Sequence, residues 1–240
     1  MFLTESPYIR FNPNPYTDTL VENWHVIRDQ YFSTAMLENQ RDTDGWLRND
    51  TGAKANRETV NFKGVLYEGR FKSMSMFLRD SITDEKEKAA LKWRDDEIYR
   101  WWPKRAERMP WLAGYVREHV DHIAGVTFNT AMPGSTLNHH WGLDPRYLRL
   151  HLCLEAAEGC AFNIEGWEHE WQDGELFAFD DANVLHGTKH TGTNPRSILL
   201  IDIHKDILRP YAATWPCRDS RPRKDLWADI KTSCSVIKPA

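Results

Sequence analysis

The pattern of hydrophobic and polar positions changes character about halfway along the chain. In the first half, apolar residues recur at helical spacing, which predicts a helix over residues 17–35. We expect a second helix over 83–102, rich in Glu, Lys and Ala and ended by Pro103, and a third over 110–122, begun by Pro110. The first 15 residues contain three prolines and are expected to be extended, and the polar residues 40–60 are expected to form a loop.

From residue 123 the apolar positions fall into short runs separated by turn residues such as Pro133-Gly134 and Asp173-Gly174. Several short strands with regular punctuation are typical of a β-sandwich or barrel rather than of alternating β–α units. We therefore predict one domain over 1–240, with a mainly helical part (1–122) packed on a β-core (123–205) and followed by a C-terminal extension (206–240). The predicted strands are Gly125–Ala131, Arg146–Glu155, Cys160–Ile164, Glu168–Gln172, Glu175–Phe179, Val184–His190 and Arg196–Ile203.

The run from Tyr147 to Leu154 has the clearest alternation in the chain. One face consists of leucines only, whereas the other carries Arg149 and His151 between Tyr147 and Cys153. A strand is expected here, with its leucine face against an apolar layer. An arginine and a histidine on the opposite face either meet solvent or bind an anionic group, because burying them without a partner is costly.

Composition and charge narrow the class of protein. A net charge of -4 gives no case for nucleic-acid binding, and no stretch approaches the roughly 20 apolar residues of a membrane span. The four cysteines form no CxxC pair, and we recognise no secretory signal, so a disulfide framework is not expected and the protein is predicted to be cytoplasmic. The oligomeric state cannot be predicted from these features.

Two histidines precede strand-borne arginines at similar distances. His140 lies nine residues before Arg149, and His186 lies ten before Arg196. Non-haem iron oxygenases hold Fe(II) with two histidines and usually one carboxylate, and arginine binds carboxylates with two parallel hydrogen bonds. The carboxylate usually stands two residues after the first histidine, but here that position is Gly142. A lone histidine is more often structural than a ligand, and it is the pairing with arginines that favours a metal site.

The same segment resembles the catalytic domain of the aspartyl/asparaginyl β-hydroxylase family. The resemblance covers roughly residues 123–205 and implies an α+β fold with a distorted double-stranded β-helix core, of the jelly-roll or cupin type. In that family the position of Gly142 is also glycine, and water takes the place of the carboxylate. The matching features are Pro133-Gly134, His140-x-Gly142, Arg149-x-His151, Phe179-Asp180-Asp181, and His186 with Arg196 ten residues later.

Carried over position by position, the resemblance implies that His140 and His186 bind Fe(II) and that Arg196 pairs with the distal carboxylate of 2-oxoglutarate. Arg149 and His151 would contact this co-substrate. The family often has a serine at the position of Asn129, whose amide can still donate and accept hydrogen bonds. The implied reaction uses O2 to hydroxylate an unactivated C–H of an amino acid, an amino-acid derivative or a peptide side chain, with release of succinate and CO2.

Three alternatives stay open at this point. Glycine at position 142 leaves room for chloride, so the same site would serve a halogenase. The fold would also suit a non-catalytic β-barrel binding module, or a zinc site in which His190 joins the histidine pair. His139 is expected to point away from His140 because neighbours on an extended chain face opposite ways. His190 is otherwise expected on the substrate side or at the surface.

Overall fold

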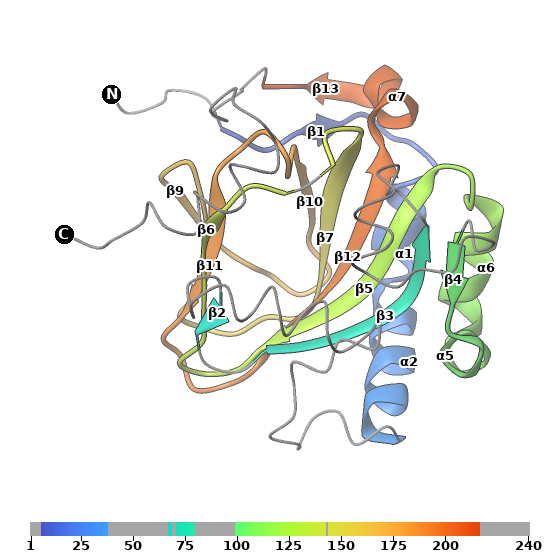
Figure 1. The fold of residues 1–240 in the computed structure, drawn as a ribbon, viewed down its shortest axis with the longest axis horizontal. Helices are drawn as coiled ribbons and strands as arrows, with labels where there is room; N and C mark the ends of the chain where they lie inside the picture. Colours follow the sequence, from blue (N-terminus) through green and yellow to red (C-terminus); the bar gives the residue numbers. More distant parts are fainter. Residues whose placement is uncertain (1–5, 38–66, 69–70, 80–98, 143, 217–240) are drawn as a thin grey trace, which may run out of the picture.

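The computed structural model describes residues 6–37, 67–68, 71–79, 99–142 and 144–216. Within them, two antiparallel sheets face each other and helices cover the outer side of the larger sheet (Figure 1). The larger sheet has the order β10 (Leu176–Phe179), β7 (Tyr147–Glu155), β12 (Arg196–His204), β5 (Ile123–Ala131), β3 (Phe71–Arg79) and β4 (Tyr99–Trp101). The smaller has the order β2 (Tyr67–Glu68), β6 (Thr136–His140), β11 (His186–His190), β8 (Cys160–Ile164) and β9 (Trp167–Glu170).

The strand order confirms the predicted cupin-like double-stranded β-helix core. Consecutive strands often lie in different sheets, so the chain crosses repeatedly from one layer to the other. A separate pair joins the two ends of the described chain, because β1 (Arg10–Phe11) pairs with β13 (Ala212–Thr214). Part of the predicted C-terminal extension is therefore attached to the barrel, together with helix α7 (Lys205–Leu208) and the short 3-10 helix η1 (Arg209–Tyr211).

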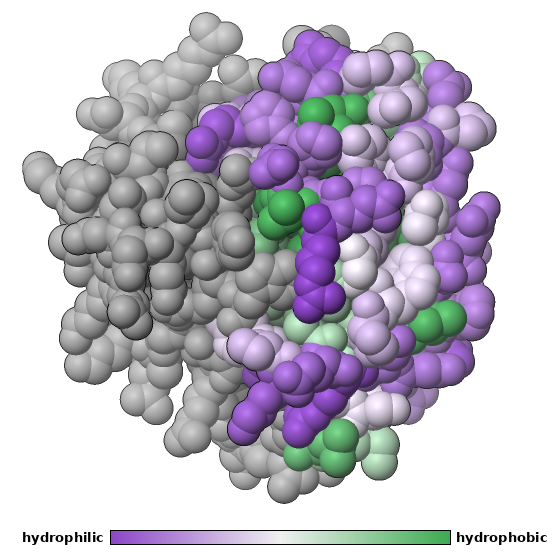
Figure 2. All heavy atoms as spheres, turned by 90° about the vertical axis from the view of Figure 1, so that its right-hand side faces the viewer, coloured by the Kyte–Doolittle hydropathy of each residue, from purple (hydrophilic) through white to green (hydrophobic). Residues whose placement is uncertain are grey.

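Among the described residues, four helices pack against the outer face of the larger sheet: α1 (Asp18–Glu22), α2 (Trp24–Leu37), α5 (Pro103–Arg108) and α6 (Pro110–Glu118). Proline stands at the first position of α5 and α6, where its missing N–H costs nothing. The ring of Tyr31 stacks on Phe128 of β5 at 4.4 Å, and its hydroxyl lies 2.8 Å from Thr130 Oγ1. The coloured surface on this side is mainly hydrophilic (Figure 2), as expected for helices whose apolar side faces the sheet. None of the described helices is long and apolar enough to cross a membrane.

Strand β7 separates two hydrophobic cores. Its four leucines are buried in the first core, between the larger sheet and the helices, as the alternation predicts. Its opposite face looks into the second core, between the two sheets, where Cys153 packs with aromatic residues. The rings of this second core are Phe71, Phe162, Trp171, Phe177 and Phe179.

All seven strands predicted after residue 123 are confirmed, with ends shifted by a few residues. The helix predicted over 17–35 is two helices, α1 and α2, separated at Asn23, and the helix predicted over 110–122 ends at Glu118. The predicted loop 40–60 lies outside the described residues.

The prediction of a mainly helical first half is wrong for two segments. Most of the predicted helix 83–102 lies outside the described residues, but Tyr99–Trp101 form β4, and Pro103 begins a helix instead of ending one. The nine residues of β3 were not predicted as a strand, and neither was β6, which carries His140. Both strands lie beside others in their sheets, and such pairing, which local sequence does not contain, decides a strand of weak pattern.

Candidate metal and carboxylate site

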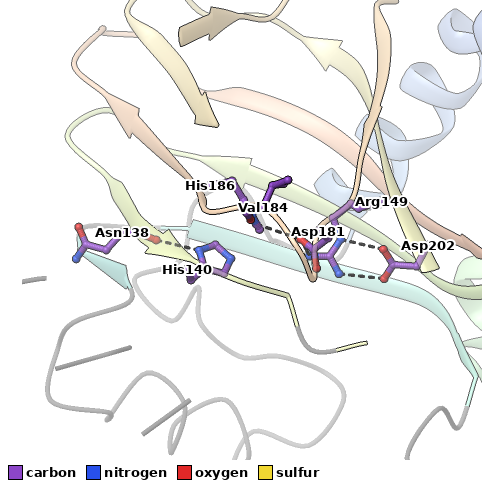
Figure 3. A network of polar contacts seen from close by, with 7 residues as sticks. All are labelled: Asn138, His140, Arg149, Asp181, Val184, His186 and Asp202. Atoms are coloured by element: carbon purple, nitrogen blue, oxygen red, sulfur yellow. Dashed lines mark hydrogen bonds and ion pairs between the residues drawn. The ribbon is translucent and has the colours of Figure 1, made fainter. Parts of the chain in front are cut away.

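The two histidines singled out from the sequence are neighbours across the smaller sheet. His140 ends β6 and His186 begins β11, and the two residues face each other in the strand register. Their ring centroids lie 4.3 Å apart, with the ring planes at 55°. Figure 3 shows both imidazoles at one end of a polar network that reaches across to the larger sheet.

Each imidazole is held by a backbone carbonyl two residues earlier in the chain. Nδ1 of His140 lies 2.9 Å from the carbonyl oxygen of Asn138, and Nδ1 of His186 lies 2.9 Å from that of Val184. A carbonyl only accepts, so each Nδ1 carries the hydrogen. Burial, reinforced by His186, lowers the pKa of His140 to about 3, which keeps this ring neutral. Its Nε2 is then the basic atom, and such anchoring of the other nitrogen is the usual arrangement for a metal-binding histidine.

Asp181 stands directly beside this pair. Its Oδ1 lies 3.1 Å from Nε2 of His186, and its backbone carbonyl accepts a hydrogen bond of 2.7 Å from the amide of Gly142. Burial by itself would raise the pKa of the Asp181 carboxyl, but Arg149 and His186 lower it by more than burial raises it. The pKa therefore lies well below its ordinary value, and the side chain is ionised. A carboxylate is therefore present next to the histidines, although it comes from a different position in the chain than the usual one.

The space that Gly142 leaves is filled by Asp181. A Cβ atom at Gly142 would lie 1.5 Å from Oδ2 of Asp181 and 2.3 Å from its Cγ, which is a direct overlap. The Asp181 carboxylate thus occupies the space beside Gly142, and the use of this position by chloride stays a prediction. The glycine allows the carboxylate to approach, which the spacing of the His140 motif did not indicate.

Arg149 links this carboxylate to the larger sheet. Its Nε and Nη2 donate to Oδ1 and Oδ2 of Asp202, at 2.9 and 3.0 Å, and its Nη1 donates to Oδ1 of Asp181 at 2.9 Å. Arg149 and Asp202 are register partners on β7 and β12. Burial raises the pKa of Asp202, and the Arg149 charge opposes this rise. The network orients Asp181 against His186, whereas the contact of Arg149 with a co-substrate stays a prediction.

A second group of polar side chains lies in the core between the sheets. Arg196 is 2% exposed and His151 is 6% exposed, and Cζ of Arg196 lies 4.3 Å from the ring centroid of Trp171. Nε and Nη1 of Arg196 and Nδ1 of His151 have no hydrogen-bond partner in the described part of the chain. Burial, followed by the charges of Arg149 and Arg196, lowers the pKa of His151 well below its ordinary value. Unused buried donors of this kind are expected where an anionic ligand binds.

Asn129 lies on β5 within the same region of the sheet. It is the register partner of Ile198, and the residue two positions further, Ala131, is the partner of Arg196. Because residues two apart on a strand share a face, Asn129 and Ala131 face the same side, and Ala131 belongs to the core between the sheets. The structure thus places Asn129 near Arg196, and its contact with a co-substrate stays a prediction.

The remaining histidines near the pair have structural partners. Nε2 of His139 lies 3.0 Å from Oδ1 of Asn163. Nε2 of His190 lies 2.6 Å from the carbonyl of Asn194, and its Nδ1 accepts from the amide of Gly192 at 3.2 Å. His190 is 1% exposed, so the expectation of a surface position is wrong, and a substrate-side position stays a prediction. With both nitrogens bonded, His190 is not a third zinc ligand. Among the described residues, no three His, Cys, Asp or Glu side chains form a metal-binding group.

The structure has two antiparallel sheets that face each other, with a histidine pair on one sheet and an arginine on the other. This architecture is that of the double-stranded β-helix class. Within this class the family can be given. A family model described as aspartyl/asparaginyl beta-hydroxylase matches residues 21–206, and the chain belongs to this family. The match confirms the resemblance noted from the sequence.

Individual relatives match over shorter stretches. The chain is 31% identical over 74 residues to the human aspartate beta-hydroxylase domain-containing protein 2, a match that covers 30% of this chain and 20% of that protein. The rat protein of the same name is also 31% identical over 74 residues and is covered to 21%. The match therefore spans about a fifth of the length of these relatives.

Solved structures of cupin type are similar over part of the chain. A predicted oxalate decarboxylase from Thermotoga maritima has a TM-score of 0.31 and 16% identity, over 37% of this chain and 73% of that chain. A sugar phosphate isomerase of the cupin superfamily from Silicibacter pomeroyi has a TM-score of 0.29 and 18% identity, over 35% of this chain and 52% of that chain.

Three residues that shape the site were not singled out from the sequence: Asp181 as a neighbour of the histidines, Asp202 and Trp171. In the sequence, Asp181 stands out only as part of the turn Phe179-Asp180-Asp181 that resembles the family. Asp202 and Arg196 are six residues apart on β12 and therefore lie on the same face of the strand. That spacing could have predicted that both side chains point to the same side of the sheet. Trp171 follows a short edge strand, and nothing in its local sequence connects it with Arg196.

Proposed function

We propose that the protein is an Fe(II)- and 2-oxoglutarate-dependent oxygenase that hydroxylates a C–H of an amino acid, an amino-acid derivative or a peptide side chain. The observation that carries the proposal is the pair of neighbouring imidazoles with both Nδ1 atoms anchored, His140 and His186. Family membership supports the hydroxylation chemistry, and the unused donors of Arg196 support a carboxylate-bearing co-substrate.

The residues present fit the metal. Nε2 of each histidine is the atom that would hold Fe(II), and the ionised Asp181 places a negative charge beside them. Imidazole and carboxylate suit Fe(II), which in such sites keeps open positions for other ligands. When bound, Fe(II) and 2-oxoglutarate would supply the oxidising chemistry with O2, and succinate and CO2 would be released.

The chain's own contribution is to bind and orient the co-substrate and to exclude water. The planar guanidinium of Arg196 suits the distal carboxylate, which it would grip with two parallel hydrogen bonds. His151 is kept neutral by burial, so its Nδ1 would serve as a hydrogen-bond donor or acceptor without adding charge. The aromatic rings around it, among them Phe162, Phe177 and Phe179, exclude water and strengthen these polar contacts.

The test is iron-dependent turnover of 2-oxoglutarate. We expect the purified protein, supplied with Fe(II), ascorbate and 2-oxoglutarate, to release succinate when screened with free amino acids and short peptides. His140→Ala and His186→Ala should each abolish this release because each removes a metal ligand. His139→Ala is the matched control: it removes the neighbouring histidine, which contacts Asn163, and should retain most of the activity.

Three results separate the proposal from its alternatives. Succinate release by His140→Ala at the wild-type rate would show that the metal role is wrong. Wild-type protein that binds neither Fe(II) nor 2-oxoglutarate would identify a non-catalytic binding module. A product that gains one oxygen atom, with or without chloride in the buffer, supports hydroxylation, whereas a chlorinated product would identify a halogenase.

A further inference from the structure

Trp171 contacts Arg196 and His151, two polar residues of the second core. We call the site formed by Arg196 and His151 the carboxylate pocket. It is 4% exposed, and its ring lies under the Arg196 guanidinium, with Cζ 4.3 Å from the ring centroid. The ring also lies nearly parallel to that of His151, at 21° and 6.2 Å between centroids. Arg196 and His151, which come from different strands, are thus brought together on one indole.

The loop that carries Trp171 is fixed to β7. The residue directly follows β9, and the turn after it is held by hydrogen bonds from the Gly174 amide to the Cys153 carbonyl at 3.0 Å, and from the Cys153 amide to the Glu175 carbonyl at 2.8 Å. Cys153 lies two residues from His151 on the same strand face. The indole is therefore set in place by backbone contacts with the strand that carries part of the pocket.

The indole nitrogen has the same property as the arginine and the histidine. Nε1 of Trp171 is buried and has no hydrogen-bond partner in the described part of the chain, and the same is true of Nε and Nη1 of Arg196 and Nδ1 of His151. Leaving a buried polar nitrogen unpaired is unfavourable, so these four nitrogens, of which those of Arg196 and Trp171 are donors, need a common explanation. A bound anion that accepts from them supplies one.

We propose that Trp171 is a binding residue of the carboxylate pocket. Its ring packs against the Arg196 guanidinium, and its Nε1–H donates a hydrogen bond to the distal carboxylate that Arg196 binds. This inference rests on the proposed function, because it takes 2-oxoglutarate as the ligand. The ring contact is a cation–π interaction, which strengthens when both groups are desolvated. The indole thereby orients the guanidinium and adds a donor that an aliphatic side chain or phenylalanine lacks.

The experiment compares two metal chelators in the Mn(II)-loaded protein without oxygen, by calorimetric titration. 2-Oxoglutarate has a distal carboxylate, whereas oxalate chelates a metal ion but has none. Trp171→Phe keeps an aromatic ring at this position and removes the N–H together with the five-membered part of the indole. We expect it to weaken 2-oxoglutarate binding by about tenfold or more, from the loss of a hydrogen bond to a charged group, and to leave oxalate binding within about twofold.

Trp111→Phe on α6 is the control, since Trp111 packs against the other core, and it should bind both ligands as the wild type does. If Trp171→Phe binds 2-oxoglutarate as tightly as the wild type does, the inference is overturned. An equal loss of affinity for 2-oxoglutarate and oxalate would also overturn it, because it would indicate general damage to the site. Wild-type protein that binds oxalate but not 2-oxoglutarate would instead overturn the proposed function.

Discussion

Gly142 shows how a missing side chain shapes the candidate metal site. The position is buried, and a Cβ atom added there would meet the Asp181 carboxylate first. The same glycine donates its amide hydrogen to the backbone carbonyl of Asp181, which holds the two backbones together. A carboxylate therefore reaches the histidine pair from the turn before β11, and only glycine at 142 permits this approach.

Gly142→Ala should displace the Asp181 carboxylate, since the new methyl group would overlap it. Changes in groups that orient metal ligands typically cost about 10- to 100-fold in metal affinity, and we expect a loss of this size for Fe(II) or Mn(II), measured by anaerobic titration. Gly114→Ala on α6 is the matched control, because a Cβ there meets nothing within 4 Å. Unchanged metal affinity in Gly142→Ala would show that Asp181 has no part in binding.

Among the elements, β7 connects stability with the site. It is flanked by β10 and β12, so its backbone is paired on both sides. Its leucine face supports the helices, and its other face presents Arg149 and His151 to the interior. One strand thus contributes to both cores, and the position of its polar side chains depends on the packing behind them.

Leu152→Ala should remove about 2–5 kcal/mol from the free energy of unfolding, because Leu152 is 1% exposed and its loss leaves a cavity in the first core. Urea denaturation measures this change. Leu37, the last residue of α2, is 70% exposed, so Leu37→Ala is the same substitution at the surface. It should change the free energy of unfolding by less than about 0.5 kcal/mol. Equal effects of the two would contradict the assignment of the first core.

How well the elements could be predicted depended on their local pattern. β7 was predictable because its regular alternation leaves one face for each environment, and β12 because it is a short, continuous apolar run. β3 and β4 were not, because their strand state depends on pairing with β5 and with each other. The same holds for β6, a five-residue strand of polar side chains.

At the scale of the whole molecule, the barrel interior keeps histidines uncharged. Burial lowers the pKa of both His140 and His151, although they lie on opposite sheets, and the arginines that face the interior add to the effect. The folded protein therefore does not take up the protons that these histidines bind once the chain unfolds. Above the pKa of histidine in the unfolded chain, keeping these side chains neutral costs no stability. As the pH falls below that pKa, protons bind preferentially to the unfolded chain, and the free energy of unfolding decreases.

We expect the free energy of unfolding of the metal-free protein to decrease as the pH is lowered from about 7.5 to about 5.5, by at most about 1.4 kcal/mol per pH unit for each histidine. Urea midpoints across this range measure the slope. His151→Gln should make the slope shallower, whereas His25→Gln, which alters an exposed histidine of α2, should leave it unchanged. A slope that is the same in all three proteins would contradict the assignment.

Local sequence was enough to predict strands in the second half of this protein and to single out His140, His186, Arg149, His151 and Arg196, because period-2 alternation and residue type are local properties. Three contacts became visible only in the folded chain: Asp181 fills the space at Gly142, Asp202 orients Arg149, and Trp171 lies under Arg196. These contacts join strands and turns far apart in the chain, and strand register and the crossing between sheets set their distances.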